Sequence, residues 1–182
     1  GSRCKWLGCG VRIKLIAAGV ALVAALAASA VFLFPTPKLS DAEFTAAYAA
    51  PLAPVGQPLT VFHLGHSLVG RDMPAMLAQM KPGHDYASQL GWGATMKSHW
   101  EGDVAGFAEE NAHPRFEAVN EALATGRFDA FVVTEMVEIK DAIAYFDSSE
   151  YLGRWARLAR SSNPDIRVYL YETWHNLDDP AG

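Results

Sequence analysis

A serine, a histidine, a glutamate and two glycines each follow a run of residues that we expect to form a strand. Ser67 follows the first run, Gly91 and Gly93 the second, Glu135 the third and His175 the fourth. A serine nucleophile needs a base to take its proton and donors to hold the charge that develops on the substrate oxygen. Glycines after a strand leave backbone N–H groups open to such an oxygen. The set therefore predicts an acyl-transfer site with Ser67 as nucleophile.

Each of these residues also has a purely structural interpretation. A serine after a strand is most often a turn former or a helix cap, and the G-x-S-x-G elbow is absent because Val69 stands two residues after Ser67. His66 fits an ordinary turn, and Glu135 fits a solvated carboxylate at a strand end. His63 and His66 have no third ligand in view, so we expect no metal site and no cofactor.

These residues form one site only if their strands end at one edge of a sheet. We expect strands at 59–64, 85–89, 128–134 and 166–171, and helices at 72–80, 114–125 and 148–160. Strands that alternate with helices imply right-handed βαβ units and a parallel sheet covered on both faces. Ligands of such sheets bind beyond the carboxyl ends of the strands. The sequence therefore predicts an α/β domain over residues 59–182.

The first 34 residues differ from the rest in composition. Residues 1–14 carry four lysines and arginines, and residues 15–34 follow without a charge. About 20 apolar residues span a bilayer as a helix, and the basic flank places the N-terminus on the cytoplasmic side. A cleaved signal peptide is the alternative, with a small-residue site at 28–30, although the apolar run continues past it to Phe34. Both interpretations place the domain in the periplasm or outside the cell.

Residues 35–58 contain five prolines and are expected to form a linker, with a short helix at 41–50 capped by Ser40 or Asp41. The formal charge of −5, with no stripe of Lys and Arg after residue 40, argues against a nucleic-acid partner. The two cysteines, Cys4 and Cys9, precede the apolar segment. The domain therefore has neither a disulfide framework nor a cysteine-based metal site.

Two sequence blocks resemble the SGNH (GDSL-like) hydrolases. The first block of that family is a strand followed by Gly-Asp-Ser or Gly-Asn-Ser, and here Gly65-His66-Ser67 has His66 at the acidic or amide position. The second block often reads Gly-x-Gly-Ala-Thr, which Gly91-Trp92-Gly93-Ala94-Thr95 matches. The resemblance implies a flavodoxin-like three-layer sandwich with a parallel sheet. It also implies an oxyanion hole made by the N–H groups of Ser67 and Gly93.

Two family features are absent from this sequence. The third block of the family supplies an Asn as a further oxyanion donor, whereas the third strand here ends in Thr134-Glu135. Either the hole has two donors, or Glu135 has another role such as binding substrate hydroxyls, to which we also assign His66. The family's Asp-x-x-His occurs nowhere in the 182 residues. Either this Asp and His lie beyond residue 182 in a longer chain, which we expect, or His175 is the base.

The expected function is therefore ester hydrolysis outside the cytoplasm. Acyl groups on polysaccharides or other glycans are the preferred substrates, followed by free lipids and small esters. The expected partners are a small-molecule or glycan ester and, through residues 15–34, the membrane. The alternative is a non-catalytic glycan-binding or assembly module that keeps the fold without a working triad.

Overall fold

The computed structural model describes residues 40–49, 53–136 and 138–171. The chain divides into two units, Gly1–Pro54 and Val55–Gly182. In the first unit, helix α2 spans Asp41–Ala49 and begins with a reciprocal cap. The Ser40 N–H donates to Glu43 Oε2 (2.8 Å), and the Glu43 N–H donates to Ser40 Oγ (3.3 Å). The expected short helix and its cap at Ser40 are confirmed.

The expected membrane segment at 15–34 and its basic flank at 1–14 lie outside the described residues. Among the helices that the structure does describe, none combines the length and the apolar character needed to cross a bilayer.

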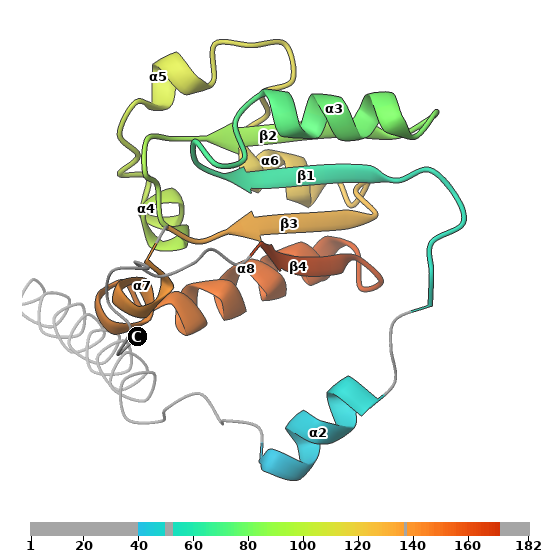
Figure 1. Cartoon of the computed structure of the whole chain (residues 1–182), viewed down its shortest axis with the longest axis vertical. Coiled ribbons are helices and arrows are strands. Elements are labelled where there is room, and N and C mark those ends of the chain that lie inside the picture. The colour runs from blue at the N-terminus through green and yellow to red at the C-terminus, as the bar shows by residue number, and fades with distance from the viewer. Residues whose placement is uncertain (1–39, 50–52, 137, 172–182) are drawn as a thin grey trace, which may run out of the picture. The chain divides into compact units, whose positions relative to one another are not determined.

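The second unit is built on a four-stranded sheet in which all neighbours are parallel (Figure 1). Its strands are β1 (Thr60–Gly65), β2 (Asp85–Leu90), β3 (Ala130–Thr134) and β4 (Arg167–Tyr171). They lie in the order β2-β1-β3-β4. The predicted α/β class and the four predicted strands are confirmed, with ends that differ by at most two residues.

Helices connect these strands in sequence. Helix α3 (Asp72–Met80) joins β1 to β2; α4 (Met96–Glu101), α5 (Phe107–Glu110) and α6 (Val119–Ala124) lie between β2 and β3; α7 (Ile139–Tyr145) and α8 (Ser148–Ser162) lie between β3 and β4. The first crossover runs in one direction along the sheet and the later two run in the other. Right-handed crossovers therefore place α3 on one face, and α4, α6 and α8 on the opposite face. In agreement, α4 and α6 both pack against α8.

The helix predicted at 114–125 begins five residues later than expected, at Val119. The segment before it is extended instead, because Phe116 forms a parallel bridge with Ser88 at the outer edge of β2. The Ser88 N–H donates to the Arg115 carbonyl (2.9 Å), and the Glu117 N–H donates to the Ser88 carbonyl (3.3 Å). Pairing with a sheet edge thus outweighs the helix propensity of this segment.

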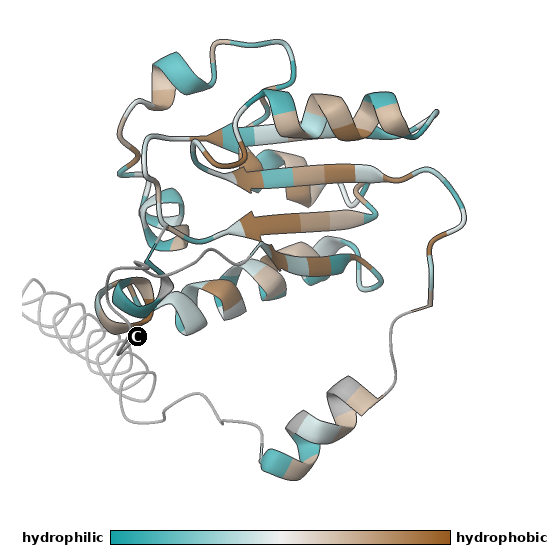
Figure 2. Ribbon diagram, viewed as in Figure 1, coloured by the Kyte–Doolittle hydropathy of each residue, from teal (hydrophilic) through white to brown (hydrophobic). Residues whose placement is uncertain are grey.

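The core lies between the sheet and the helices α4, α6 and α8. Phe62, Phe128, Phe131 and Trp155 are each at most 1% exposed. Phe62 contacts Phe128 edge-on with ring centroids 5.3 Å apart, and Phe131 contacts Trp155 at 6.2 Å. Figure 2 shows the matching hydrophobic colouring along β1 and β3. Burial of such side chains contributes about 1.5–3 kcal/mol each, so the central strands form a firm base for residues at their carboxyl ends.

Candidate active site

The two sequence blocks meet at the carboxyl edge of the sheet. Gly65, the last residue of β1, is the register partner of Leu90, the last residue of β2. The Gly91 N–H donates to the Gly65 carbonyl (3.1 Å). Ser67 follows the end of β1 by two residues, and Gly93 follows the end of β2 by three. The residues that sequence analysis selected therefore extend from neighbouring strand ends.

Ser67 and Gly93 are both exposed, and both have groups available to a ligand. Within the described part of the chain, neither backbone N–H donates a hydrogen bond, and the Ser67 hydroxyl has no partner. Gly93 has a φ of +52°, and a Cβ built there would meet no atom within 4 Å. One hydroxyl and two backbone N–H groups at this edge are thus accessible and have no partner among the described residues.

A compact turn carries Ser67. The N–H groups of Val69 and Gly70 both donate to the His66 carbonyl, at 2.9 and 3.0 Å. The turn lies so close to the sheet that a Cβ on Gly65 would be 2.7 Å from Val69 Cγ2 and 3.0 Å from Thr134 Cβ. Glycine at position 65 therefore lets the Ser67 turn fold back over the ends of β1 and β3.

His66 ties this turn to the end of β3. Its ring is 2% exposed, its Nε2 is 2.9 Å from the Glu135 carbonyl, and the Leu68 N–H lies 3.4 Å from Nδ1. Because a carbonyl only accepts and an N–H only donates, this geometry suits a proton on Nε2 and an acceptor at Nδ1. Both nitrogens are engaged with the backbone, which gives His66 a supporting position. Its expected contact with substrate stays a prediction.

Glu135 is the most deeply buried of the predicted site residues. Its side chain is fully buried, which contradicts the alternative of a solvated carboxylate at the strand end. Oε1 accepts the N–H of Met136 (2.8 Å), and Oε2 is buried without a partner among the described residues. Unpaired buried carboxylate oxygens are costly. The expected role of Glu135 in binding substrate hydroxyls stays a prediction.

Sequence analysis missed two residues that support the site, Gln89 and His99. Gln89 Oε1 accepts the Val119 N–H (3.0 Å), Gln89 Nε2 is 3.1 Å from His99 Nδ1, and His99 Nε2 is 2.9 Å from the Gly65 carbonyl oxygen. Burial lowers the pKa of His99 to about 4, and the bond to Gly65 partly offsets this. The sequence signal was a polar Gln in a predicted buried strand, because a buried amide needs partners.

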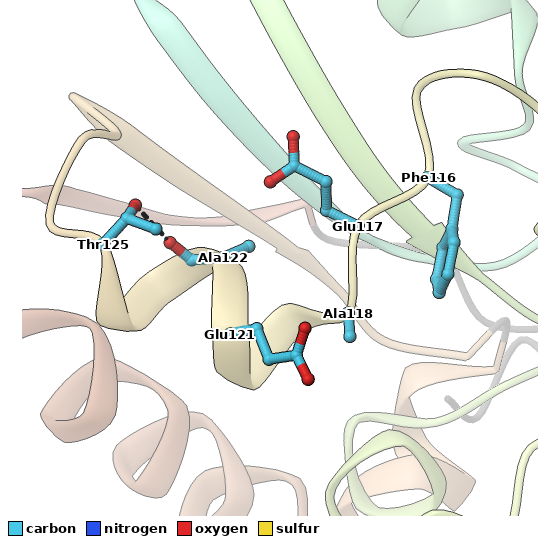
Figure 3. Close-up of a pocket in the computed structure, with 6 residues that line it drawn as sticks. All are labelled: Phe116, Glu117, Ala118, Glu121, Ala122 and Thr125. Atoms are coloured by element: carbon cyan, nitrogen blue, oxygen red, sulfur yellow. Dashed lines mark hydrogen bonds between the residues drawn. The ribbon is translucent and has the colours of Figure 1, made fainter.

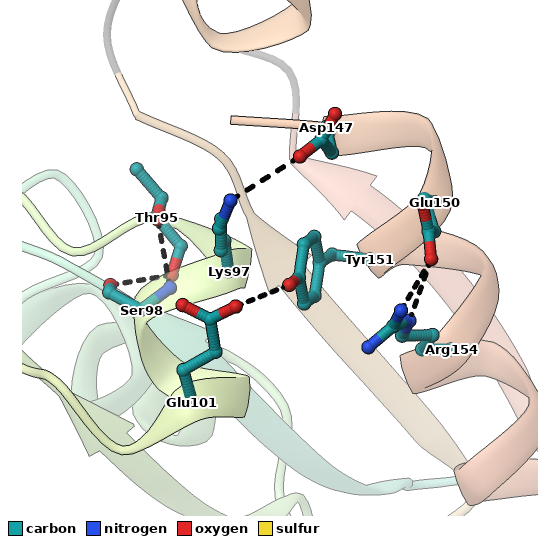
Figure 4. A network of polar contacts seen from close by, with 8 residues as sticks. All are labelled: Thr95, Lys97, Ser98, Glu101, Asp147, Glu150, Tyr151 and Arg154. Carbon is teal, nitrogen blue, oxygen red and sulfur yellow. Dashed lines mark hydrogen bonds and ion pairs between the residues drawn. The ribbon is translucent and has the colours of Figure 1, made fainter. Parts of the chain in front are cut away.

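Helix α4, which carries His99, is held against α8. The indole N–H of Trp155 donates to the Met96 carbonyl (3.0 Å) inside the protein. Lys97 pairs with Asp147 (3.3 Å) at the surface, and Figure 4 shows the other polar contacts around this junction. Because this ion pair is exposed and screened by solvent, it adds little, and the buried indole bond and the surrounding apolar contacts fix α4 in place.

The described residues also line two open pockets, neither of which Ser67 borders. One of about 460 Å³ lies along α6 (Figure 3), and its lining residues are Phe116, Glu117, Ala118, Glu121, Ala122 and Thr125. A second, of about 220 Å³, borders Gln89 and His99. None of the predicted site residues lines either pocket. Over the described ranges, no group of three His, Cys, Asp or Glu side chains is arranged to hold a metal ion.

A base for Ser67 is not found among the described histidines. None of them is hydrogen-bonded to the Ser67 hydroxyl. His175, the candidate base from the sequence, lies outside the described residues. The structure thus brings together Ser67, Gly93, His66 and Glu135 at one edge of the sheet and leaves the base as a prediction.

Comparison with known proteins gives no relative for this chain. No family model matches it, and neither a curated protein nor a solved structure does so.

Proposed function

We propose that the chain is a serine hydrolase of the SGNH type that acts on ester bonds, with Ser67 as nucleophile. The observation that carries this proposal is the pairing of two strand ends that present the Ser67 hydroxyl and the N–H groups of Ser67 and Gly93, all exposed and unbonded among the described residues. The strand order β2-β1-β3-β4 is that of the first four strands of a flavodoxin-like sheet, which supports the three-layer fold.

The proposed reaction follows the usual course of acyl transfer. Ser67 Oγ attacks the ester carbonyl carbon while a base takes the hydroxyl proton. The N–H groups of Ser67 and Gly93 hold the oxyanion, and the alcohol leaves with the proton from the base. Water then releases the acyl group from Ser67. The family resemblance favours the histidine of an Asp-x-x-His pair as this base, and His175 is the alternative. The chemistry requires no cofactor.

Glu135 occupies the place of the family's third oxyanion donor. A carboxylate accepts hydrogen bonds and donates only when protonated. In this proposal a substrate hydroxyl donates to Glu135 Oε2, which has no partner among the described residues. Because this oxygen is fully buried, the contact requires the end of β3 to open toward the substrate. His66 supports the same region through its bond to the Glu135 carbonyl. The alternative is a hole with two donors and no direct role for Glu135.

The proposed substrates are acyl esters of glycans outside the cytoplasm. The uncharged segment at 15–34 and its basic flank support a membrane-tethered domain on the periplasmic or extracellular side. Glycan esters fit that location better than intracellular metabolites do. This preference rests on location and on the family resemblance, and the site geometry itself requires only an ester carbonyl.

The proposal is tested with a fluorophosphonate probe on the full chain. Wild type is expected to be labelled at Ser67, as peptide mapping shows, and Ser67→Ala is expected to remain unlabelled. Ser149→Ala is the matched control, because Ser149 is an exposed serine on α8 and its loss should leave labelling unchanged. A wild-type chain that stays unlabelled would contradict the nucleophile assignment.

A non-catalytic glycan-binding module is the second candidate. The observation that favours it is that no described histidine is hydrogen-bonded to the Ser67 hydroxyl. This candidate predicts an unlabelled wild type that binds acylated glycans as well as Ser67→Ala does. Turnover of those glycans by wild type would rule it out.

A further inference from the structure

Three hydrogen bonds link the end of β1 to the start of α6, and the backbone fixes their directions. The Val119 N–H only donates, so the Gln89 group that faces it (3.0 Å) is the carbonyl oxygen. The NH₂ group of Gln89 therefore faces His99 Nδ1 (3.1 Å) and donates to it. Nδ1 is the acceptor, so the proton of His99 is on Nε2 and is donated to the Gly65 carbonyl (2.9 Å). The neutral His99 tautomer is thus determined from both ends.

We propose that His99 is a positioning residue that holds the Ser67 turn and the Gly93 loop in a fixed relation. This inference rests on the proposed role of Ser67 as nucleophile. The Gly65 carbonyl lies two residues before Ser67 and accepts from both the His99 ring and the Gly91 N–H. His99 itself lies on α4, which begins three residues after Gly93. One carbonyl oxygen therefore connects the nucleophile and the oxyanion donor.

The environment of His99 suits a fixed strut. The side chain is 5% exposed, and burial keeps the pKa of the ring at about 4, so the ring is neutral near pH 7. The α4 helix that bears it is bonded to α8 through Trp155 and Met96 (3.0 Å). Without the His99 side chain, the Gly65 carbonyl keeps the Gly91 N–H as its donor among the described residues, and the Ser67 turn becomes more mobile.

Two amide variants separate the two bonds of the ring. His99→Gln places an amide near the position of Nε2 and keeps a donor for the Gly65 carbonyl. His99→Asn places its amide near the position of Nδ1, where it reaches Gln89 but not Gly65. His99→Leu removes both bonds at similar volume. A general loss of packing would lower the labelling rate of His99→Gln and His99→Asn alike. A positioning role predicts that only His99→Asn is slowed.

The test measures two quantities on the full chain, at a temperature where circular dichroism shows each variant folded. These are the rate constant for fluorophosphonate labelling of Ser67 and the hydrogen exchange of the segment 65–71. We expect His99→Gln to label close to the wild-type rate, and His99→Asn and His99→Leu to label about 10–100-fold more slowly. Hydrogen exchange in segment 65–71 should rise in His99→Asn and His99→Leu only.

Two results would overturn the positioning role. One is an equal labelling rate for His99→Asn and His99→Gln, and the other is a rate within about twofold of wild type for all three variants. In either case a labelled wild type would still support the nucleophile proposal. A third result is an unlabelled wild type together with the expected rise in hydrogen exchange in His99→Asn and His99→Leu. It would reject Ser67 as nucleophile but support the positioning of the Ser67 turn by His99.

Discussion

Two histidines in the same domain are both buried, but one has hydrogen-bond partners and the other has none among the described residues. His99, at the carboxyl edge, is 5% exposed, and both of its ring nitrogens are within 3.1 Å of a partner. His63, in the middle of β1, is 2% exposed, and neither ring nitrogen has a partner among the described residues. The pKa of each ring is lowered to about 4, chiefly by burial, and the charge of His84 is the second cause at His63.

This difference separates buried polar residues that hold the carboxyl edge through hydrogen bonds from buried polar residues that only lower the stability of the sheet. His63 is the register partner of Ser88, whose hydroxyl is also buried without a partner in the described structure. A polar group buried without a hydrogen bond lowers stability by about 1–3 kcal/mol. At the carboxyl edge, His66 and His99 avoid this penalty. Backbone groups engage both nitrogens of His66, and the Gly65 carbonyl and the Gln89 amide engage those of His99. Hydrogen bonds therefore hold the two histidines at the carboxyl edge, whereas His63 in the middle of β1 is held by packing.

The largest expected effect is a loss of stability in acid. A histidine titrates near pH 6.5 when unfolded and near pH 4 at positions 63 and 99, so the unfolded chain binds protons first as the pH falls. Each ring should remove roughly 2–3 kcal/mol from the free energy of unfolding between pH 6.5 and pH 4.5. Urea unfolding of the full chain at several pH values, followed by tryptophan fluorescence, measures this loss.

The control is His63→Leu, which should lose about 2–3 kcal/mol less than wild type over the same pH range because it has one titrating ring fewer. An identical pH dependence in this variant would show that His63 takes up its proton at the same pH whether the chain is folded or unfolded.

The next effect, measured at pH 7, compares Leu at the two histidine positions. His99→Leu leaves the NH₂ of Gln89 without its acceptor and removes one donor from the Gly65 carbonyl, which should lower the free energy of unfolding by about 1–3 kcal/mol. His63→Leu removes two unpaired nitrogens and should leave stability unchanged or raise it by up to about 1 kcal/mol.

Chemical denaturation at pH 7 gives both values on the same scale. Equal losses at the two positions would contradict the comparison, because they would mean that the hydrogen bonds of His99 contribute nothing beyond its packing.

The sequence was sufficient for the fold because the strands carry local signals. The apolar runs around Phe62, Phe131 and Val168 predicted strands that the structure confirms, and their alternation with helices predicted the parallel sheet. The helix at 114–125 was predicted too long, since the bridge between Phe116 and Ser88 is a long-range contact with no local pattern.

The candidate site was predictable where residues follow strand ends, and it was not where side chains meet across elements. Ser67 and Gly93 could be placed because parallel strands end at one edge. The bond from His99 to Gly65 joins residues 34 positions apart, so neither sequence spacing nor residue type indicated it. The burial of Glu135 depends in the same way on the tertiary packing around the end of β3.

The smallest expected effect is at Ser88, the register partner of His63. Ser88→Ala removes a buried hydroxyl that has no partner among the described residues, and it leaves the backbone bonds to Arg115 and Glu117 intact. Stability should therefore stay within about 0.5 kcal/mol of wild type or rise slightly. Thermal unfolding of Ser88→Ala, of His63→Leu and of the double variant measures both the effect and its additivity. A loss above about 1 kcal/mol that vanishes in the His63→Leu background would show that the two groups share a hydrogen-bonded partner. His63 would then be held by hydrogen bonds, as His66 and His99 are at the carboxyl edge.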